Sequence, residues 1–234
     1  MFTFRSQTLD PYIFYQVVHQ NEYKLKDDLS DKIIIDIGSH IGSFSIACLQ
    51  RNAKYVYAYE AHPENYQIAK NNILKVSDKA IVENLAVIGS EQNEKVSYND
   101  LSFNTGQHRI SDNIYGDKLV NTIKFDKIIN SIVTKHSTKV HLVKLDCEGS
   151  EYPILYTSLC LYSIENIVGE YHDDVPLIDI DEDNHFQHNG EGFMEFLKHS
   201  GFMVFKRHMK NTGLFFATRK LSEAPFLIPV DKFS

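Results

Sequence analysis

Several hydrophobic runs along the chain are continuous and do not alternate with polar positions. The clearest are IIIDI at 33–37, YVYAY at 55–59 and VHLVKL at 140–145. Strands with this pattern are typically buried on both faces, as in a parallel sheet that helices cover on each side. Because segments of helical spacing separate the runs, the chain is predicted to form an open α/β sheet with right-handed crossovers.

The predicted elements alternate between strand and helix through the first two thirds of the chain. We expect strands at Lys32–Ile37, Lys54–Tyr59, Ala80–Val87, Lys95–Tyr98, Val140–Leu145 and Ile164–Tyr171. We expect helices at Tyr12–Tyr23, Gly42–Arg51, Pro63–Val76, Ser150–Leu159 and Gly192–Ser200. A closing antiparallel pair is expected from Met203–Lys206 and Leu214–Thr218, and polar loops are expected at Asn99–Gly116 and Asp173–Asn189.

The turn after the first strand has the composition of a ligand-binding loop. In an open α/β sheet, ligands bind beyond the carboxyl ends of the strands, and Asp36-Ile-Gly-Ser-His-Ile-Gly42 lies at such an end. Gly38 and Gly42 allow positive φ and a close approach of a ligand to the main chain. Ser39 and His40 fill the middle, so the loop lacks the tighter G-x-G-x-x-G spacing of a dinucleotide site. The wider loop suits a ligand with an amino-acid end; a tight turn without a ligand is the alternative interpretation.

The ends of the second and third strands add groups that suit a nucleoside. Glu60 and Ala61 follow the second strand, where an acid can accept hydrogen bonds from both ribose hydroxyls. Asn84-Leu85-Ala86 lies near the end of the third, where the Asn84 amide offers a donor and an acceptor to a base edge. Each of these residues is also typical of a solvated strand end, but together with the glycine loop they favour an adenosine ligand.

Acidic side chains and a histidine gather at the ends of the fourth and fifth strands. Asp146 and Glu148 follow the fourth strand in VKLDCEGSEYPIL, and they would face the reacting end of a donor bound across the first three strands. Helix capping is the alternative role for Glu148 and Glu151, since a helix dipole favours acids in the first turn. His172 ends the fifth strand and is a candidate base, because an ordinary imidazole pKa of about 6.5 suits proton transfer at neutral pH.

The same strand ends leave open a metal site. Asp146, Glu170 and His172, with Asp173, could hold a divalent ion that orients acceptor oxygens, although we expect no metal. The acidic segment Asp181–His188 is interpreted as a solvated loop. Asn104–His108, within the long polar loop, is a candidate lid over the acceptor.

Taken together, these segments resemble the FkbM-like family of S-adenosylmethionine-dependent methyltransferases. The matching pieces are DIGSHIGSFS, YAYEAHPENYQIAKNNI, NLAV, NTG in the long loop and VKLDCEGSEYPIL, over about Lys32 to Thr218. The most specific of them is the last, with the pattern K-x-D-x-E-G-x-E-x-x-x-L. Two positions depart from the family pattern: His40 stands where asparagine is more usual, and Cys147 where an aliphatic residue is expected.

The resemblance implies a class I methyltransferase Rossmann-like fold. Its mostly parallel, seven-stranded sheet would end in an antiparallel hairpin and carry helices on both faces. It also implies S-adenosylmethionine as donor and a hydroxyl of a sugar or other small specialised metabolite as acceptor. By position, Asp36 to Gly42 would wrap the methionine part, Glu60 would hold the ribose, and Asp146 and Glu148 would line the acceptor side. We expect one catalytic domain over 1–234, with an N-terminal helical cap at 1–30 and a Rossmann-like core at 31–220.

Composition narrows the class of partner and compartment. A net charge of −7 lacks the positive footprint of a nucleic-acid-binding protein, so no nucleic-acid partner is expected. The small-molecule or sugar-like acceptor is the partner that the resemblance implies. Three cysteines without C-x-x-C spacing indicate free thiols in a reducing compartment. The N-terminus lacks a secretory pattern and no apolar stretch approaches a membrane span, so we expect a cytoplasmic protein with no membrane partner. Aromatic residues near the N-terminus leave a homodimer open.

Three other functions remain as alternatives. An N-methyltransferase acting on an amine or peptide needs less help in removing a proton from its acceptor. A non-catalytic nucleotide-binding protein would keep the donor pocket without turnover. A nucleotide-dependent oxidoreductase would need the tight dinucleotide turn, which the sequence lacks.

Overall fold

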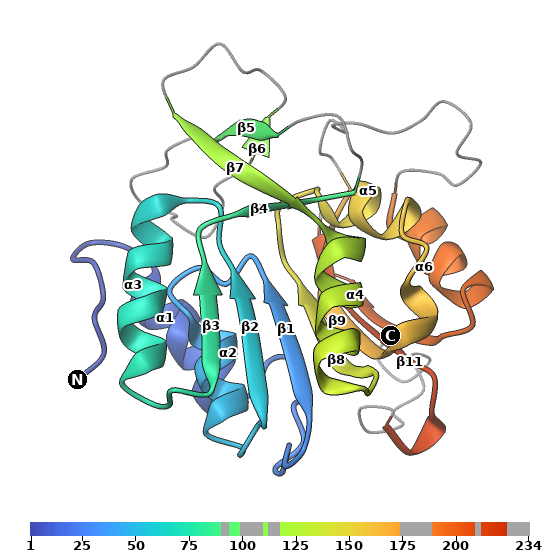
Figure 1. Cartoon of the computed structure of the whole chain (residues 1–234), viewed down its shortest axis with the longest axis horizontal. Helices are drawn as coiled ribbons and strands as arrows, with labels where there is room; N and C mark the ends of the chain where they lie inside the picture. The colour runs from blue at the N-terminus through green and yellow to red at the C-terminus, as the bar shows by residue number, and fades with distance from the viewer. Residues whose placement is uncertain (90–93, 99–109, 112–117, 174–188, 209–211, 224–234) are drawn as a thin grey trace.

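The computed structural model describes residues 1–89, 94–98, 110–111, 118–173, 189–208 and 212–223. Within them, one seven-stranded sheet has the order β10-β11-β9-β8-β1-β2-β3 (Figure 1). The parallel strands are β1 (Ile33–Ile37), β2 (Tyr55–Tyr59), β3 (Ala80–Glu83), β8 (Val140–Leu145) and β9 (Ile164–His172). The antiparallel hairpin consists of β10 (Met203–His208) and β11 (Thr212–Thr218). The predicted mostly parallel sheet with a closing antiparallel hairpin is confirmed.

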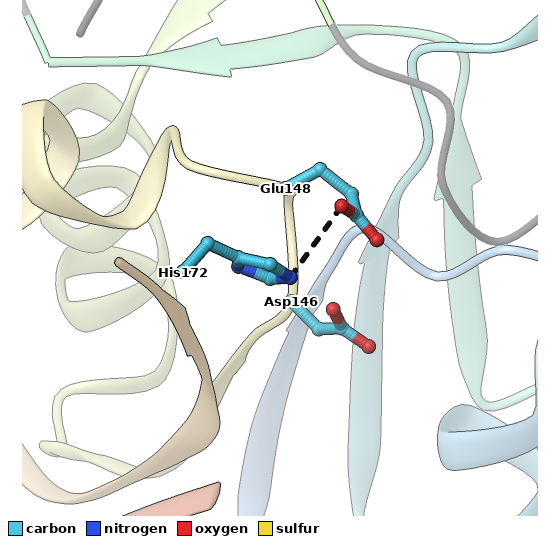
Figure 2. A group of neighbouring side chains, drawn as sticks. All are labelled: Asp146, Glu148 and His172. Atoms are coloured by element: carbon cyan, nitrogen blue, oxygen red, sulfur yellow. Dashed lines mark ion pairs between the residues drawn. The ribbon is translucent and has the colours of Figure 1, made fainter. Parts of the chain in front are cut away.

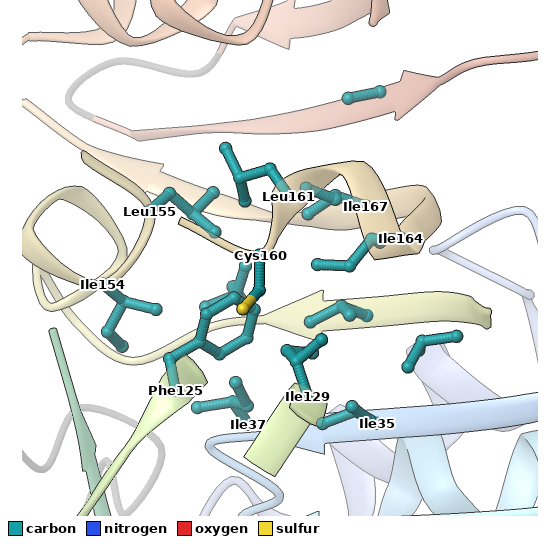
Figure 3. Close-up of a cluster of buried hydrophobic side chains, with 14 of the residues drawn as sticks. Ile35, Ile37, Phe125, Ile129, Ile154, Leu155, Cys160, Leu161, Ile164 and Ile167 are labelled. Atoms are coloured by element: carbon teal, nitrogen blue, oxygen red, sulfur yellow. The ribbon is translucent and has the colours of Figure 1, made fainter. Parts of the chain in front are cut away.

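Helices cover both faces of this sheet because successive strand residues point to opposite sides. Ile35 and Ile37 pack with α4 (Phe125–His136), α5 (Glu151–Tyr156) and α6 (Gly190–His199), and Figure 3 shows part of this core. Ile34 packs on the other face with α1 (Asp10–Phe14), the π-helix η1 (Tyr15–His19), α2 (Ser43–Leu49) and α3 (Pro63–Leu74). Burial of the continuous apolar runs on both faces follows from this arrangement.

A smaller sheet lies beyond the carboxyl ends of the main strands. Its order is β4-β7-β5-β6, formed by β4 (Ala86–Ile88), β7 (Leu119–Lys124), β5 (Lys95–Tyr98) and β6 (Ile110–Ser111). In Figure 1 it crosses above the ends of β1, β2 and β3. Two short 3₁₀ helices complete the described elements, η2 (Leu161–Ser163) and η3 (Leu221–Glu223). The small sheet therefore covers the end of the main sheet where a ligand is expected to bind.

The predicted strand Ala80–Val87 is wrong as a single element, because the chain changes sheets at Asn84. The Asn84 amide donates to the carbonyl oxygens of Glu60 and Ala61 at 2.8 and 2.9 Å. These bonds turn the chain out of β3, which pairs with β2, into β4, which pairs with β7. A side chain that holds backbone carbonyls of a neighbouring loop thus ends one strand and starts another.

The predicted helix Tyr12–Tyr23 is also wrong in its extent. An α-helix covers Asp10–Phe14, and a π-helix continues it only to His19. Asn21 and Lys24 then adopt left-handed φ angles of 51° and 52°, which no helix of L-residues continues through.

The structure also contains β7 and α4, in a region to which the sequence analysis assigns no element. Phe125, Ile128, Ile129 and Ile132 are buried at one face of α4. Their spacing is that of an amphipathic helix, so the signal was present in the sequence. Ile110–Ser111 also forms β6 inside the predicted loop Asn99–Gly116, most of which lies outside the described residues.

None of the helices in the described part of the chain has the length and apolar character that crossing a bilayer requires.

The hydroxyls of Tyr152 and Tyr57 have different surroundings, so replacing each tyrosine by phenylalanine should affect stability differently. Tyr152 is fully buried, and its hydroxyl has no hydrogen-bond partner among the described residues. The Tyr57 hydroxyl lies 2.7 Å from Nε2 of His136 and forms a hydrogen bond with it. Tyr152→Phe is expected to leave the free energy of unfolding unchanged or to raise it, whereas Tyr57→Phe should lower it by about 1 kcal/mol. Urea denaturation measures both, and a larger loss for Tyr152→Phe than for Tyr57→Phe would contradict this view of the core.

Candidate functional site

A cavity of about 470 Å³ lies beyond the carboxyl ends of β1, β2 and β8. Its walls come from the glycine loop, the end of β2, the start of β4, the loop after β8 and the N-terminal helical segment. Of the predicted ligand-binding residues, Gly38, Ser39, His40, Glu60, Ala61, Leu85 and Ala86 line it. Asp36, Gly42 and Asn84 do not line it, and they support the residues that do. The site therefore lies where strand ends place ligands in this kind of sheet.

The glycine loop is packed tightly against the loop that follows β8. Gly38 has a φ of 72°, and a Cβ atom built there would lie 1.9 Å from the backbone oxygen of Asp146. Only glycine permits both the left-handed conformation and the contact. The amides of Gly38 and Ser39 donate to the carbonyl oxygen of Tyr59 at 3.0 and 3.1 Å, which ties the loop to β2 as well.

Asp36 lies beneath the loop, where its partners are protein groups. Its Oδ2 accepts a hydrogen bond of 2.7 Å from the hydroxyl of Ser45, and its Oδ1 lies 3.4 Å from the ammonium of Lys144. The carboxylate is fully buried. Asp36 therefore fixes the position of the loop, and a direct contact with a methionine end stays a prediction.

Lys144 is a functional residue that the sequence analysis missed. Its ammonium donates to the carbonyl oxygen of Gly38 at 2.6 Å and lies 3.7 Å from Oδ2 of Asp146. Burial lowers its pKa, but the charges of Asp36 and Asp146 outweigh burial, so the pKa is raised and the ammonium stays charged. The available signal was a lysine inside the otherwise apolar run VHLVKL.

Two buried hydroxyls in the cavity wall lack protein partners. Ser39 Oγ and Ser43 Oγ form no hydrogen bond within the described part of the chain, and both residues line the cavity. Leaving a buried polar group unsatisfied costs about 1–3 kcal/mol, so such groups mark places where a bound molecule supplies the partner. Both hydroxyls are therefore candidates to bind a polar end of a ligand.

Glu60 presents a buried carboxylate at the end of β2. Its Oε2 accepts from the amide of His40 at 2.7 Å, and its Oε1 accepts from the amide of His62 at 2.8 Å. Burial raises its pKa to about 7, although the two amide hydrogen bonds act in the opposite direction. Each oxygen keeps a lone pair for a further donor, which is the requirement for binding a diol.

At the acidic end of the cavity, Asp146 and Glu148 line the wall, and His172 lies beside them without lining the cavity itself (Figure 2). Nε2 of His172 lies 3.4 Å from Oε2 of Glu148 and 3.8 Å from Oε2 of Glu170. Nδ1 lies 2.7 Å from Oε1 of Glu151, a carboxylate that is fully buried. Glu148 has a left-handed φ of 55°.

The electrostatics of this cluster change the expectation for His172. Burial lowers its pKa, but the hydrogen bond and charge of Glu151, with Glu148, raise it to about 9. The imidazole therefore carries a proton at neutral pH in the ligand-free protein and cannot accept another. The premise of an ordinary pKa of about 6.5 is corrected, because the partner carboxylates stabilise the charged ring.

The N-terminal segment forms a wall of the cavity, with Tyr12 among the lining residues. Tyr23 lines the cavity, and its hydroxyl donates to Oδ2 of Asp146 at 3.0 Å. Arg5 donates from Nη2 and Nε to the two oxygens of Asp10, each at 3.0 Å, and Asp10 lies 3.4 Å from Nε2 of His40. His40, which departs from the family pattern, thus joins the glycine loop to the N-terminal segment.

Two predicted segments fall on residues that the structure does not describe. The candidate lid Asn104–His108 and the acidic segment Asp181–His188 lie outside the described residues. Cys147, the other departure from the family pattern, lines the cavity, and its thiol lies 3.7 Å from Oε2 of Glu151.

Comparison with known proteins identifies a family. The sequence model of the methyltransferase FkbM domain matches residues 36–202, which include the glycine loop, Glu60, the acidic cluster and β9. The comparison with curated proteins gave no match.

Solved structures similar to this chain have low sequence identity to it. A conserved hypothetical protein of Streptococcus pyogenes has 11% identity and a TM-score of 0.49, with 87% of this chain and 96% of that chain covered. TrmK of M. capricolum, in complex with S-adenosyl-homocysteine, has 13% identity and a TM-score of 0.47, with 86% and 68% covered. Precorrin-6y C5,15-methyltransferase of Geobacter metallireducens has 13% identity and a TM-score of 0.45, with 93% of each chain covered.

The raised pKa of Glu60 predicts a specific dependence of stability on pH. The folded protein holds this proton up to about pH 7, whereas the unfolded chain releases it near 4.5. The associated stability is therefore fully present below pH 4.5 and is lost as pH rises through 7. Between pH 5 and pH 8, the wild type should lose about 2 kcal/mol of unfolding free energy that Glu60→Gln does not lose.

Urea denaturation at a series of pH values measures this difference. Glu64→Gln, on the same side of the molecule but with a side chain 60% exposed, is the control and should follow the wild type. Parallel pH curves for wild type and Glu60→Gln would show that Glu60 titrates at its ordinary value.

Proposed function

The chain belongs to the FkbM methyltransferase family, and we propose that it transfers a methyl group from S-adenosylmethionine to a hydroxyl oxygen of a small, sugar-like molecule. The cavity that joins the glycine loop, Glu60 and the acidic cluster in one space is the observation that carries the proposal. A donor and an acceptor must meet in one site for direct transfer, since proximity supplies a large part of the rate.

The donor end of the cavity fits S-adenosylmethionine group by group. The hydroxyls of Ser39 and Ser43 would bind the polar methionine end, because both are buried in the wall without a partner in the described structure. Glu60 would accept hydrogen bonds from the ribose hydroxyls. Leu85 and Ala86 provide an apolar surface for the adenine ring. S-Adenosylmethionine supplies a sulfonium-bound methyl group when it is bound.

The acidic end suits the positive charge of the sulfonium. Asp146, Glu148 and Glu170 line the cavity beside Lys144, whose ammonium is already paired with Asp36 and the carbonyl of Gly38. Carboxylates at short range stabilise a cation in a partly buried site. The methyl group would therefore point toward the loop after β8 and the end of β9.

An acceptor hydroxyl needs a group that takes its proton. In the proposed reaction the acceptor oxygen forms a bond to the methyl carbon, the carbon–sulfur bond breaks, and the bond electrons stay on the sulfur of S-adenosylhomocysteine. The hydroxyl proton passes to the Asp146 carboxylate, which lines the cavity, because burial and the neighbouring acids raise the pKa of Glu170 to about 8 and leave it protonated at neutral pH. His172, protonated between Glu148 and Glu151, is not placed to accept it at neutral pH. A positioned base contributes about 10²–10⁴-fold to such a step.

Donor binding is the first test of the proposal. At pH 8, isothermal titration calorimetry should detect S-adenosylhomocysteine binding, and Glu60→Gln should weaken it by at least about 10-fold through loss of a charged acceptor. Ser43→Ala should weaken it by a smaller factor, and Glu64→Gln should leave it unchanged. NAD should give no heat. Binding of NAD in place of S-adenosylhomocysteine, or of neither, would contradict the assignment.

Transfer itself is tested with labelled donor. Incubation of the protein with trideuteriomethyl S-adenosylmethionine and a small-molecule cell extract should yield a product with the label on oxygen, identified by mass spectrometry and NMR. Asp146→Asn should lower the yield at least about 10-fold, while the exposed Asp28→Asn should not. A label on nitrogen would favour the alternative N-methyltransferase, and donor binding without any product would favour a non-catalytic binding protein.

A further inference from the structure

We propose that Asp146, Glu148 and His172 form a divalent-cation site at the acceptor side of the cavity. Its catalytic role rests on the proposed function, but cation binding itself does not. The sequence analysis expected no metal and offered Asp146, Glu170 and His172 as the alternative set; the geometry points to Glu148 as the third ligand.

The three side chains offer ligand atoms at close range. One oxygen of Asp146, one oxygen of Glu148 and one ring nitrogen of His172 all lie within 4.8 Å of one another. Figure 2 shows the side chains converging from the loop after β8 and the end of β9. Small rotations of the two carboxylates would bring all three atoms to the distances of about 2.0–2.6 Å at which divalent ions are bound.

The histidine is held in the orientation that a metal ligand requires. Nδ1 donates to Oε1 of Glu151 at 2.7 Å, so Nε2 is the ring nitrogen that faces Glu148. Oε2 of Glu151 is fixed in turn by the amide of Gly149 at 2.9 Å. Metal-binding histidines almost always donate their other ring nitrogen to a carboxylate or carbonyl, which fixes the tautomer and the plane of the ring. Glu151 is fully buried, and its position behind the ring supplies this support from outside the three ligands.

The balance of charge around the cluster also favours a cation. Acidic side chains outnumber cationic ones around the cluster: Glu22, Asp146, Glu148, Glu151 and Glu170 lie near Lys144, His172 and Arg207, and burial and the neighbouring acids raise the pKa of Glu170 to about 8. The ammonium of Lys144 is already paired with Asp36 and donates to the carbonyl oxygen of Gly38. A divalent ion between Asp146 and Glu148 would offset the repulsion, because low-dielectric surroundings strengthen both the repulsion and the attraction.

The ligand set narrows the kind of ion and its role. Two carboxylates and one imidazole suit Mn²⁺ or a similar divalent ion with open positions, since hard oxygen ligands dominate. An acceptor hydroxyl bound at an open position would lose its proton more readily and lie next to the sulfonium methyl. In this arrangement His172 would be a ligand, and the proton of the hydroxyl would pass to solvent water.

Titration of the EDTA-treated, dialysed full chain with MnCl₂ alone tests the site. Calorimetry and the electron paramagnetic resonance signal of Mn²⁺ should both report binding of a single ion. His172→Gln and Glu148→Gln should each weaken it by about 10–100-fold, and Glu151→Gln by about 10-fold. Glu165→Gln is the matched control, because Glu165 forms a similar pair with His141 at 3.0 Å elsewhere in the fold.

The outcomes separate the cation site from the proposed function. Circular dichroism and thermal unfolding confirm that each variant is folded before its affinity is compared. Absence of Mn²⁺ and Zn²⁺ binding by the wild type, or equal binding by Glu148→Gln and wild type, would overturn the cation site. If the same EDTA-treated protein still binds S-adenosylhomocysteine, the proposed donor stands without the metal. Mn²⁺ binding without any affinity for S-adenosylhomocysteine would leave the cation site standing and remove the donor.

Discussion

The glycine loop and the loop after β8 touch backbone to backbone, and one buried ammonium holds them together. At Gly38 there is no room for a Cβ atom beside the carbonyl of Asp146, and Lys144 donates to the carbonyl of Gly38 from the strand below. A buried charge is costly unless it is paired, and here Asp36 and Asp146 pair it from either side. The contact fixes the distance between the donor end and the acidic end of the cavity. Every role proposed for Glu60, Asp146 and Glu148 depends on that distance.

The acidic end is assembled from groups that would repel one another if they were not held separately. Tyr23 donates to Asp146, the amide of Gly149 donates to Glu151, and His172 lies between Glu148 and Glu151. A tyrosine hydroxyl, a backbone amide and an imidazole shared by Glu148 and Glu151 thus hold these carboxylates in place and offset their mutual repulsion. The negative charges that would stabilise a sulfonium or a divalent ion are thus positioned before the cation binds, which is electrostatic preorganisation.

The main sheet could be predicted from sequence because burial on both faces imposes continuous apolar runs. The strands 33–37, 55–59 and 140–145 follow directly from that constraint. The break at Asn84 could not be predicted this way, because it depends on carbonyl groups of a loop more than twenty positions earlier. The site was predictable only where position along a strand decides it, as for Glu60 and Asp146. The pKa of His172 depends on Glu151, and the environment of His40 on Asp10, so both required the three-dimensional structure.

Glu151 decides what the imidazole of His172 can do. Its carboxylate is fully buried and bonded to Nδ1, so the proton on that nitrogen is retained in every state of the site. Nε2 can then be in one of three states, which we call its occupants: it carries a proton that faces Glu148, it binds a metal ion, or it keeps the free lone pair of a neutral ring. A proton at Nε2 makes His172 a fixed cation that neutralises Glu148. An ion there places the same ring in the acceptor's coordination shell. Both of these states leave Nε2 without a free lone pair, so removal of the acceptor's proton then falls to another group. Only the third occupant, the lone pair of a neutral ring, lets His172 act as the base.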